Sequence, residues 1–519
     1  MSLDLSLGGR MSLDMYLEET FTQINSMNVL CIEIIQAMEQ VISSIDFFLS
    51  DNQLKGKTYS SAKTFMQQSF RPLAQGIIYL CEELIRQNDK YPSDFVVQVA
   101  STDVIEQEVL EQILKIDRLK LNMEGLLDNI PLIEEIPTMF DDIKQKLQER
   151  LDHLYEFNTT SSTNYDMAIQ LAENITKGLA QLKGGNGFNS TTGTFSTKGM
   201  DLSWAANLTK IHYTRKAKEH YGNYLKKNPE DLQKVITILK YEETHPKYIN
   251  QTNEFLTPLE EKDKIEIKYL MYTAEEPYRT LAVKYLDKFT IAETNESGVF
   301  DANVNTLTFD VSEDRNNERG QYYTFFHEVG HAIDYYYGIE HGFKGFYSDS
   351  YTFDGKSLAN LMYEDAEANF RSELQSKMHS SKYDHLSSDE KKEMINNITD
   401  NLLNQNKYFG ALTQQEKELQ RTMMVIYFEK LKGPDNNSAS DVYGGITNKT
   451  IEGSYSHEDD YWLDKNGKRI VEPNQEGFAQ YYGRIITPDG EEKDAGIKSI
   501  EHFLPKSKQH MDKMFKSME

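Results

Sequence analysis

An apolar seam over residues 17–49 determines what the first part of the chain can form. Its positions alternate steps of four and three residues, and only one of them, Asn28, is polar. The apolar members are Leu17, Phe21, Ile24, Cys31, Ile35, Met38, Ile42, Ile45 and Leu49. This spacing keeps one face of a long helix apolar, so the segment predicts a single helix that packs on a partner as in a coiled coil.

A second helical stretch follows the seam closely enough to be that partner. The polar residues 51–56 end in Gly56, which is suited to closing a helix. Apolar residues then continue at helical spacing through Leu73, Ile77, Leu80 and Leu84. Residues 101–182 are rich in Leu, Ile, Glu and Lys and are also predicted to be helical. We therefore expect a helical hairpin within an elongated all-α module over residues 1–182.

The composition changes in the middle of the chain. Residues 183–200 are rich in Gly, Ser, Thr and Asn, which is typical of a flexible linker. Beyond them aromatic residues become frequent, residues 229–241 have helical spacing, and residues 304–311 alternate apolar and polar like a half-buried strand. Residues 201–519 are therefore expected to form a separate α+β domain.

The charge balance excludes some classes of partner. The 519 residues include 56 Lys and Arg against 82 Asp and Glu, a net charge of −26. Such a chain repels phosphate backbones and anionic bilayers, so nucleic-acid binding is not expected. No stretch approaches the roughly 20 apolar residues of a membrane-spanning helix, and the N-terminus lacks the pattern of a cleavable signal. Export would therefore need a route without such a signal.

The two cysteines, Cys31 and Cys81, both lie within apolar helical stretches. Two cysteines provide neither a disulfide scaffold nor a cysteine-built zinc site. We expect two buried thiols, with one interhelical disulfide as the alternative.

The motif with the clearest chemical meaning is His327-Glu328-Val329-Gly330-His331. The two histidines are four apart on an expected helix, so both imidazoles can reach one Zn²⁺ at about 2.0–2.1 Å. Glu328 lies beside them, where it could take a proton from a zinc-bound water and return it to a leaving amine. The structural alternative is a surface helix with two solvated histidines, which the flanking aromatic residues disfavour.

A catalytic zinc usually has three protein ligands, so a third ligand is expected elsewhere. Glu476 lies on a helix-like run with aromatic packing residues, and Glu367 lies among other charges on a second helical stretch. Spacing alone does not choose between these two glutamates. Asp334, one turn after His331, could hydrogen-bond a ligand histidine, or serve as a helix cap or surface residue.

The segment FFHEVGHAID, preceded by VNTLTFDVSED, resembles the catalytic domain of the gluzincin metallopeptidases related to anthrax lethal factor. The downstream segments are similar to zincin domains of phage-associated proteins and bacterial toxins, in which a Tyr-x-His-x-x-x-Tyr-Trp element precedes a Glu-x-Phe-Ala motif. The matching residues here are Tyr455, His457, Tyr461, Trp462, Glu476, Phe478 and Ala479. This resemblance implies that Glu476 is the third zinc ligand.

The sequence departs from the lethal-factor pattern at one position. In that pattern a tyrosine seven residues before the glutamate ligand lies over the metal, whereas this chain has Arg469 there. The donor that stabilises the oxyanion must then come from another residue, and Tyr461 and His457 are the candidates. The alternative is that Tyr461 only packs in the core and His457 caps a turn.

The N-terminal half resembles the LXG domains of Gram-positive polymorphic toxins that are exported by type VII secretion systems. The residues that carry this resemblance are 15–20, Leu54-Lys55-Gly56, 57–63, Pro72-Leu73 and Gly76. The resemblance implies small helical secretion partners that bind the seam or its outer face. The alternative is a coiled-coil oligomerisation stalk.

Together these features predict a secreted toxin of a Gram-positive bacterium whose C-terminal domain is a zinc-dependent endopeptidase. Its partners would be a protein substrate, the small helical secretion proteins and, for an antibacterial toxin, an immunity protein. Two alternative functions stay open. One is a non-enzymatic protein with a zincin fold, either a secreted interaction protein or a phage-type structural protein. The other is a zinc amidase that acts on cell-wall peptide.

Overall fold

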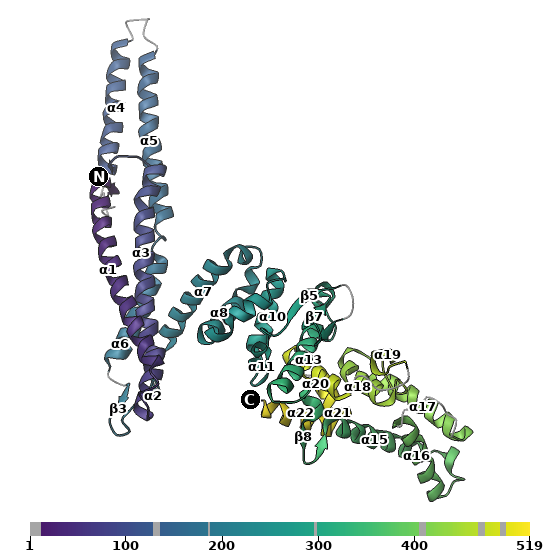
Figure 1. Cartoon of the computed structure of the whole chain (residues 1–519). Coiled ribbons are helices and arrows are strands. Elements are labelled where there is room, and N and C mark those ends of the chain that lie inside the picture. The colour runs from purple at the N-terminus through teal and green to yellow at the C-terminus, as the bar shows by residue number, and fades with distance from the viewer. Residues whose placement is uncertain are drawn as a thin grey trace, which may run out of the picture. The chain divides into compact units, whose positions relative to one another are not determined.

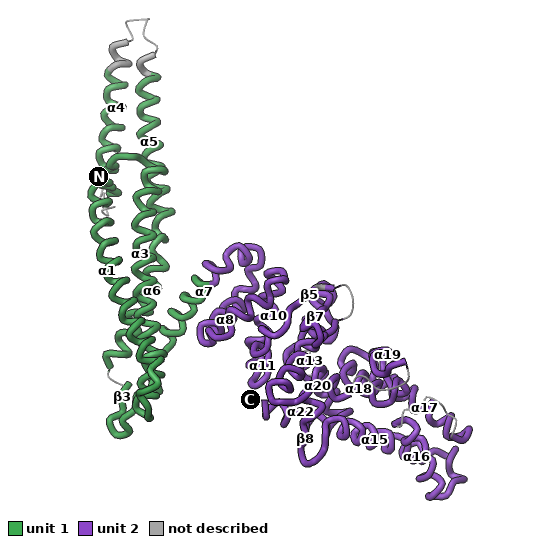
Figure 2. The backbone as a smooth tube through the Cα atoms, in the orientation of Figure 1, with its two compact units in different colours: residues 1–216 green, residues 217–519 purple. Residues whose placement is uncertain are grey.

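The computed structural model describes residues 12–127, 135–184, 187–294, 298–403, 412–465, 473–487 and 495–518. The chain divides into two compact units, residues 1–216 and 217–519 (Figure 2). The division lies inside one helix, α7 (Ser203–Leu225), and not in the expected linker at 183–200.

The first unit consists of long helices joined by short connections (Figure 1). They are α1 (Leu17–Ser50), α2 (Lys57–Phe65), a π-helical turn at Met66–Phe70, α3 (Arg71–Gln98), α4 (Glu106–Leu127), α5 (Glu135–Ser161) and α6 (Asp166–Lys183). Two short antiparallel pairs accompany them: β1 (Asp14–Met15) with β2 (Val104–Ile105), and β3 (Phe188–Asn189) with β4 (Thr194–Phe195). The all-helical prediction for this part of the chain is confirmed apart from these pairs.

Helices α1 and α3 form the predicted hairpin. Gly56 adopts φ +109° just before α2, a backbone conformation that glycine accepts without strain. Seam residues such as Ile35 and Met38 pack against a core cluster that includes Leu73 of α3. The polar member of the seam, Asn28, donates a hydrogen bond to Asp89 of α3 at 2.8 Å. A polar pair within an apolar seam fixes the register of the two helices.

Part of the expected linker is folded. Strands β3 and β4 form a hairpin, and the Phe195 ring lies 5.7 Å from that of Phe65 on α2. The backbone N–H of Phe195 also donates to Ser61 at 3.0 Å. The described residues of 183–200 therefore differ from the predicted flexible tether, because the aromatic side chains of Phe188 and Phe195 pack together and Phe195 finds a partner on α2.

Helix α1 also bears on the expectation that no segment is long and apolar enough to span a membrane. By length and composition α1 meets that criterion, so the expectation is wrong on this measure. The reason is that Glu33 and Glu39 are the only charged residues between positions 20 and 45. In the structure one face of α1 packs on α3, as in a helical hairpin.

Both cysteines are free and buried. The thiols of Cys31 on α1 and Cys81 on α3 are hydrogen-bonded to one another. Burial, and to a lesser extent the neighbouring Cys31, raises the pKa of Cys81 to about 12. The prediction of two buried thiols is confirmed, and the structure has no disulfide between them.

The second unit combines many helices with a small mixed sheet, which lies beside α13 (Figure 1). Its strands are β5 (Thr290–Glu293), β6 (Val299–Asp301), β7 (Thr306–Phe309) and the hairpin β8 (Thr352–Phe353) with β9 (Lys356–Ser357). Its helices after α7 are α8 (Leu232–Thr244), α9 (Ile249–Phe255), α10 (Glu261–Thr273), α11 (Tyr278–Lys284), α12 (Val311–Asp314), α13 (Tyr323–Glu340), α14 (Tyr347–Ser350), α15 (Leu358–Lys377), α16 (Ser388–Leu403), α17 (Gln414–Leu431), α18 (Asn437–Thr447), α19 (Asp459–Trp462), α20 (Pro473–Ile486), α21 (Ala495–Phe503) and α22 (Pro505–Ser517).

The sheet has the strand order β5-β7-β6, with β5 parallel and β6 antiparallel to β7. Strand β7 coincides with the centre of the predicted strand at 304–311, and its Leu307 and Phe309 are fully buried. Phe309 contacts Phe325 of α13, with ring centroids 5.2 Å apart. Helix α13 thus lies against the sheet, and it packs on α20 as well, which buries most of its residues.

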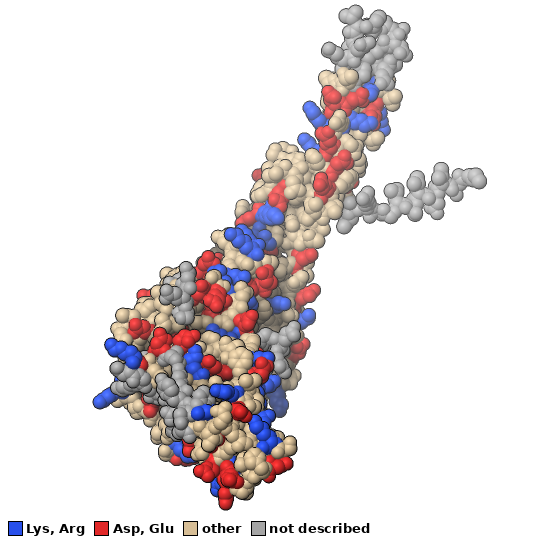
Figure 3. Space-filling model, turned by 90° about the vertical axis from the view of Figure 1, so that its right-hand side faces the viewer, with Lys and Arg blue, Asp and Glu red and all other residues tan. Residues whose placement is uncertain are grey.

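Acidic and basic side chains are interspersed on the face drawn in Figure 3. The chain also has exposed ion pairs, such as Lys120 with Asp141 at 2.6 Å and Lys382 with Glu418 at 3.0 Å. Exposed pairs of this kind contribute little to stability and are typical of a solvated surface.

Candidate metal centre

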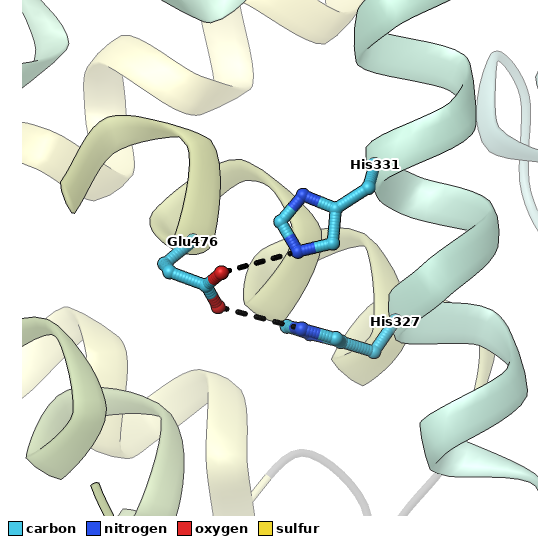
Figure 4. A group of neighbouring side chains, drawn as sticks. All are labelled: His327, His331 and Glu476. Atoms are coloured by element: carbon cyan, nitrogen blue, oxygen red, sulfur yellow. Dashed lines mark ion pairs between the residues drawn. The ribbon is translucent and has the colours of Figure 1, made fainter. Parts of the chain in front are cut away.

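Two crossing helices, α13 and α20, bring three of the predicted residues together. His327 and His331 lie one turn apart on α13, and Glu476 lies in the first turn of α20 (Figure 4). The Nε2 atom of His331 is 3.2 Å from Oε1 of Glu476, and Nε2 of His327 is 3.4 Å from Oε2. One nitrogen or oxygen from each of these residues lies within 4.8 Å of the others. Two imidazoles and a carboxylate are a donor set that zinc accepts.

Glycine residues face the opposite helix at two positions of the close crossing, and Gly330 is the one that a side chain would clash with. A Cβ atom on Gly330 would lie 2.9 Å from Cα of Ala479 on α20. A Cβ atom on Gly483 would lie 3.4 Å from the backbone nitrogen of His327. The absence of side chains here allows the two helix backbones to approach, and this approach places Glu476 opposite the histidines.

All three donor residues are buried, and Glu476 is completely so. Burial would raise the pKa of Glu476, but His331 and His457 hold it well below its usual range. Burial would likewise lower the pKa of His331, but the carboxylates of Glu476 and Glu328 raise it to about 9. The carboxyl of Glu476 is therefore an anion facing a group that can carry positive charge.

One oxygen of this anion lacks a full complement of hydrogen bonds. The hydroxyl of Tyr461 donates to Oε1 of Glu476. Oε2 is buried and accepts no hydrogen bond from the described residues. An unsatisfied buried carboxylate oxygen is costly, and a bound cation would satisfy it. This orphaned atom and the chemistry of the donor set both fit a metal ion at this position.

Glu328 lies next to the histidines but is held by a different element. Its Oε2 accepts a hydrogen bond from the backbone N–H of Phe300 on β6 at 2.8 Å, and its Oε1 is 3.9 Å from Nε2 of His327. Glu328 and His327 line a cavity of about 390 Å³ together with His457 and Tyr461. A carboxylate at this position can exchange protons with a molecule in the cavity.

His457 and Tyr461 line the same cavity. Their rings stack with centroids 3.9 Å apart. His457 Nδ1 lies 2.8 Å from Oδ1 of Asp441, and its backbone N–H donates to the same oxygen at 3.1 Å. Burial would lower the pKa of His457, but Asp441 and Glu476 raise it to about 10. Both residues predicted as oxyanion donors therefore face the cavity.

The remaining candidates lie elsewhere. Glu367 on α15 pairs with Arg371 at 2.7 Å and is not part of the group. Asp334 is fully buried and accepts from the backbone N–H and hydroxyl of Ser348 at 2.7 and 2.6 Å, so it anchors α14 and is not a surface residue. Burial raises the pKa of Asp334 to about 7. Arg469 lies outside the described residues.

Asp441 and Gln480 belong to the site but were not predicted. Asp441 is fully buried on α18, and Gln480 donates to its Oδ2 at 3.0 Å. Neither residue has a spacing relation to the zinc motif that could have identified it. A weak signal existed for both, because each lies in one of the two downstream segments, residues 440–462 and 476–482, on which the resemblance to zincin domains rests.

Comparison with known proteins identifies a family for the first unit. Residues 15–194 match the family model described as the LXG domain of the WXG superfamily. The chain carries an LXG domain. The match confirms the assignment drawn from the Leu54-Lys55-Gly56 motif, and it continues into the β3–β4 hairpin.

A protein from Bacillus cereus named "Toxin" is 57% identical to this chain over 203 residues. The aligned part is 39% of this chain and 37% of that protein. No solved structure matches the chain. The comparisons thus show an N-terminal LXG domain and similarity to part of a protein named "Toxin", and they do not test the metal centre.

Proposed function

We propose that the chain is a secreted toxin whose second unit is a zinc-dependent endopeptidase. The observation that carries the proposal is the convergence of His327, His331 and Glu476 in a buried group beside Glu328 and a cavity. The LXG domain and the similarity to a toxin support secretion from a Gram-positive bacterium.

His327, His331 and Glu476 would hold the zinc ion. When bound, zinc would polarise a peptide carbonyl and make a water molecule more acidic. Glu328, anchored by Phe300, would take the proton of the attacking water and pass it to the leaving amine. Tyr461 or His457 would donate a hydrogen bond to the oxygen that becomes negative.

Glu328 also distinguishes this proposal from a binding protein with the same fold. A protein that only binds a target has no need of a buried carboxylate that lines a cavity beside a metal-binding histidine. A zinc amidase of cell-wall peptide would use the same residues, and the material that is cut separates it from an endopeptidase.

Export partners are expected on the first unit. The predicted seam is occupied by α3, so it cannot also bind a separate protein. The outer face of α1 exposes apolar side chains, including Val29, Leu30 and Ile32, each about half exposed. An amphipathic helix of a small secretion protein of the WXG kind fits such a face.

The metal content of the full chain tests the central claim. We expect about one zinc per chain, and none after His327→Ala or Glu476→Gln, since either change leaves an incomplete ligand set. Glu367→Gln is the matched control, because it changes a glutamate of the same unit outside the site. Zinc lost from Glu367→Gln but kept by Glu476→Gln would overturn the ligand assignment.

A further inference from the structure

The only two cysteines in the sequence meet inside the helical hairpin of the first unit. Cys31 of α1 and Cys81 of α3 are far apart along the chain, yet their thiols are hydrogen-bonded to one another. Each residue is 4% exposed, and both thiols are free. The two side chains therefore point toward one another, which is the first geometric requirement of a disulfide bond.

Polar pairs on both sides of the cysteines fix the register of the two helices. Asn28, one turn before Cys31, donates a hydrogen bond to Asp89 of α3 at 2.8 Å. Nearer the other end of α1, Asp46 pairs with Arg71, the first residue of α3, also at 2.8 Å. A slide of either helix would break both pairs, so the contact between the thiols is a fixed feature of the hairpin.

Helix α1 is held in the hairpin by few buried side chains. Of its 34 residues, only Leu17, Cys31 and Ile45 are buried. Cys31 is the middle one of the three, so a covalent bond at this position would tie the helix to α3 near its centre. Such a bond would also close a loop of about 50 residues, which removes much of the conformational freedom of the unfolded chain.

The surroundings of the pair determine how such a bond forms. Burial, and to a lesser extent Cys31, raises the pKa of Cys81 to about 12, so little of the reactive thiolate exists at neutral pH. Formation of the S–S bond removes one hydrogen atom from each thiol. In thiol–disulfide exchange both hydrogen atoms pass to an external disulfide, which is reduced to two thiols. Disulfide bonds persist outside cells and are rare in a reducing cytosol, so oxidation is expected slowly and after export.

We propose that Cys31 and Cys81 form a disulfide bond once the chain leaves the reducing interior of its cell, and that this bond locks α1 onto α3. The thiol form described above is the state before oxidation. The pair uses none of the residues of the proposed peptidase, and only export is taken from the proposed function. The alternative is that both cysteines are small packing residues that remain thiols.

The first test is oxidation of the full chain by oxidised glutathione. One sample of reduced chain is incubated in its folded state, and a second is unfolded in urea and refolded in the same buffer, because burial slows the reaction of folded thiols. We expect the intact mass to fall by two hydrogen atoms, and a non-reduced digest to contain a peptide that links Cys31 to Cys81. This linked peptide in either sample supports the bond. Free thiols or glutathione adducts in both samples overturn it.

The second test measures the stability of the first unit through Trp204. This residue is 1% exposed and packs in the same core cluster as Leu73 of α3. The chain has one other tryptophan, Trp462, so Trp462→Phe makes the fluorescence of Trp204 a probe of the first unit alone. We expect the oxidised chain to unfold about 5–15 °C above the reduced chain, as follows from a disulfide that closes a loop of this length.

The double variant Cys31→Ser, Cys81→Ser is the matched control, because it keeps small side chains but cannot form the bond. Oxidised glutathione should leave its unfolding temperature unchanged. Equal unfolding temperatures of the oxidised and reduced chains would overturn the locking role of the bond. Zinc content, measured in the chain with both tryptophans, should be the same before and after oxidation. A chain that binds no zinc would refute the proposed peptidase but leave the result for the cysteines intact.

Discussion

The crossing of α13 and α20 can be tested by adding a single methyl group. In Gly330→Ala the new Cβ atom would lie 2.9 Å from Cα of Ala479 and 3.3 Å from its carbonyl oxygen. Carbon atoms pack at about 3.5–4.0 Å, so α20 must retreat by roughly half an ångström or more. Overpacking of this kind costs about 1–3 kcal/mol, while the change from Gly to Ala within a helix regains about 1 kcal/mol. The net loss of unfolding free energy is therefore about 0–2 kcal/mol.

The effect on zinc should exceed the effect on stability. Ala479 lies one turn after Glu476, so its retreat lengthens the distances of 3.2 and 3.4 Å between the carboxylate and the histidines. Metal ligands tolerate deviations of only about 0.2 Å. We expect Gly330→Ala to lose zinc to a competing chromophoric chelator at concentrations that leave the parent chain loaded.

Gly222→Ala on α7 is the matched control, because a Cβ atom there meets nothing within 4 Å. It should unfold at about the same temperature as the parent in calorimetry, since the added methyl group meets no other atom. If Gly330→Ala matches Gly222→Ala in both unfolding temperature and zinc retention, the close crossing does not hold the site together.

Three further predictions address the reaction, the fold and the partners. Glu328→Gln should keep zinc but lower the yield of new protein termini in susceptible cells about 10²–10⁴-fold; equal cleavage would exclude Glu328 as the base. Arg315→Met should cost about 3–5 kcal/mol in urea unfolding at pH 7, since it strands the buried carboxylate of Asp263, which Arg315 binds at 2.7 Å; a loss below 1 kcal/mol would contradict this. Burial would raise the pKa of Asp263, but Arg315 and Tyr322 hold it below 3.8, so the pair stabilises the fold above about pH 4 and this stabilisation is lost as the pH falls through the lowered pKa. Replacing Val29 and Leu30 together by Ser should abolish co-purification of small helical partners while helicity is unchanged; retained binding would move the partner site away from the outer face of α1.

Local spacing predicted the parts of the site that belong to one element. His327, Glu328 and His331 lie on one helix, where an interval of four residues fixes their geometry in advance. Glu476 comes from another helix, and spacing alone left it level with Glu367. The family resemblance favoured Glu476, and in the structure Glu476 faces the histidines while Glu367 pairs with Arg371.

Asp441 shows what sequence patterns cannot supply. Its hydrogen bonds join α18 to His457 and to Gln480, which is a tertiary arrangement without a fixed interval along the chain. The same limit applies to the linker, where Phe195 contacts Phe65 of a helix formed much earlier. Most of the seam of α1 was predictable because its partner, α3, follows directly along the chain, although the seam residue Phe21 is 40% exposed.

Burial is the property that separates a metal centre from two solvated histidines on a surface helix. His327 and His331 are each less than a tenth exposed, and Glu476 is fully buried with one oxygen that accepts no hydrogen bond from the described residues. Burying an ion pair that lacks part of its hydrogen bonds costs several kcal/mol, and apolar residues of similar volume would stabilise the fold more. A chain that keeps this arrangement where α13 and α20 cross closely, with Gly330 to allow the approach, accepts that cost for something other than stability. Binding of a divalent cation would offset the cost, since it supplies the charge that the buried carboxylate lacks.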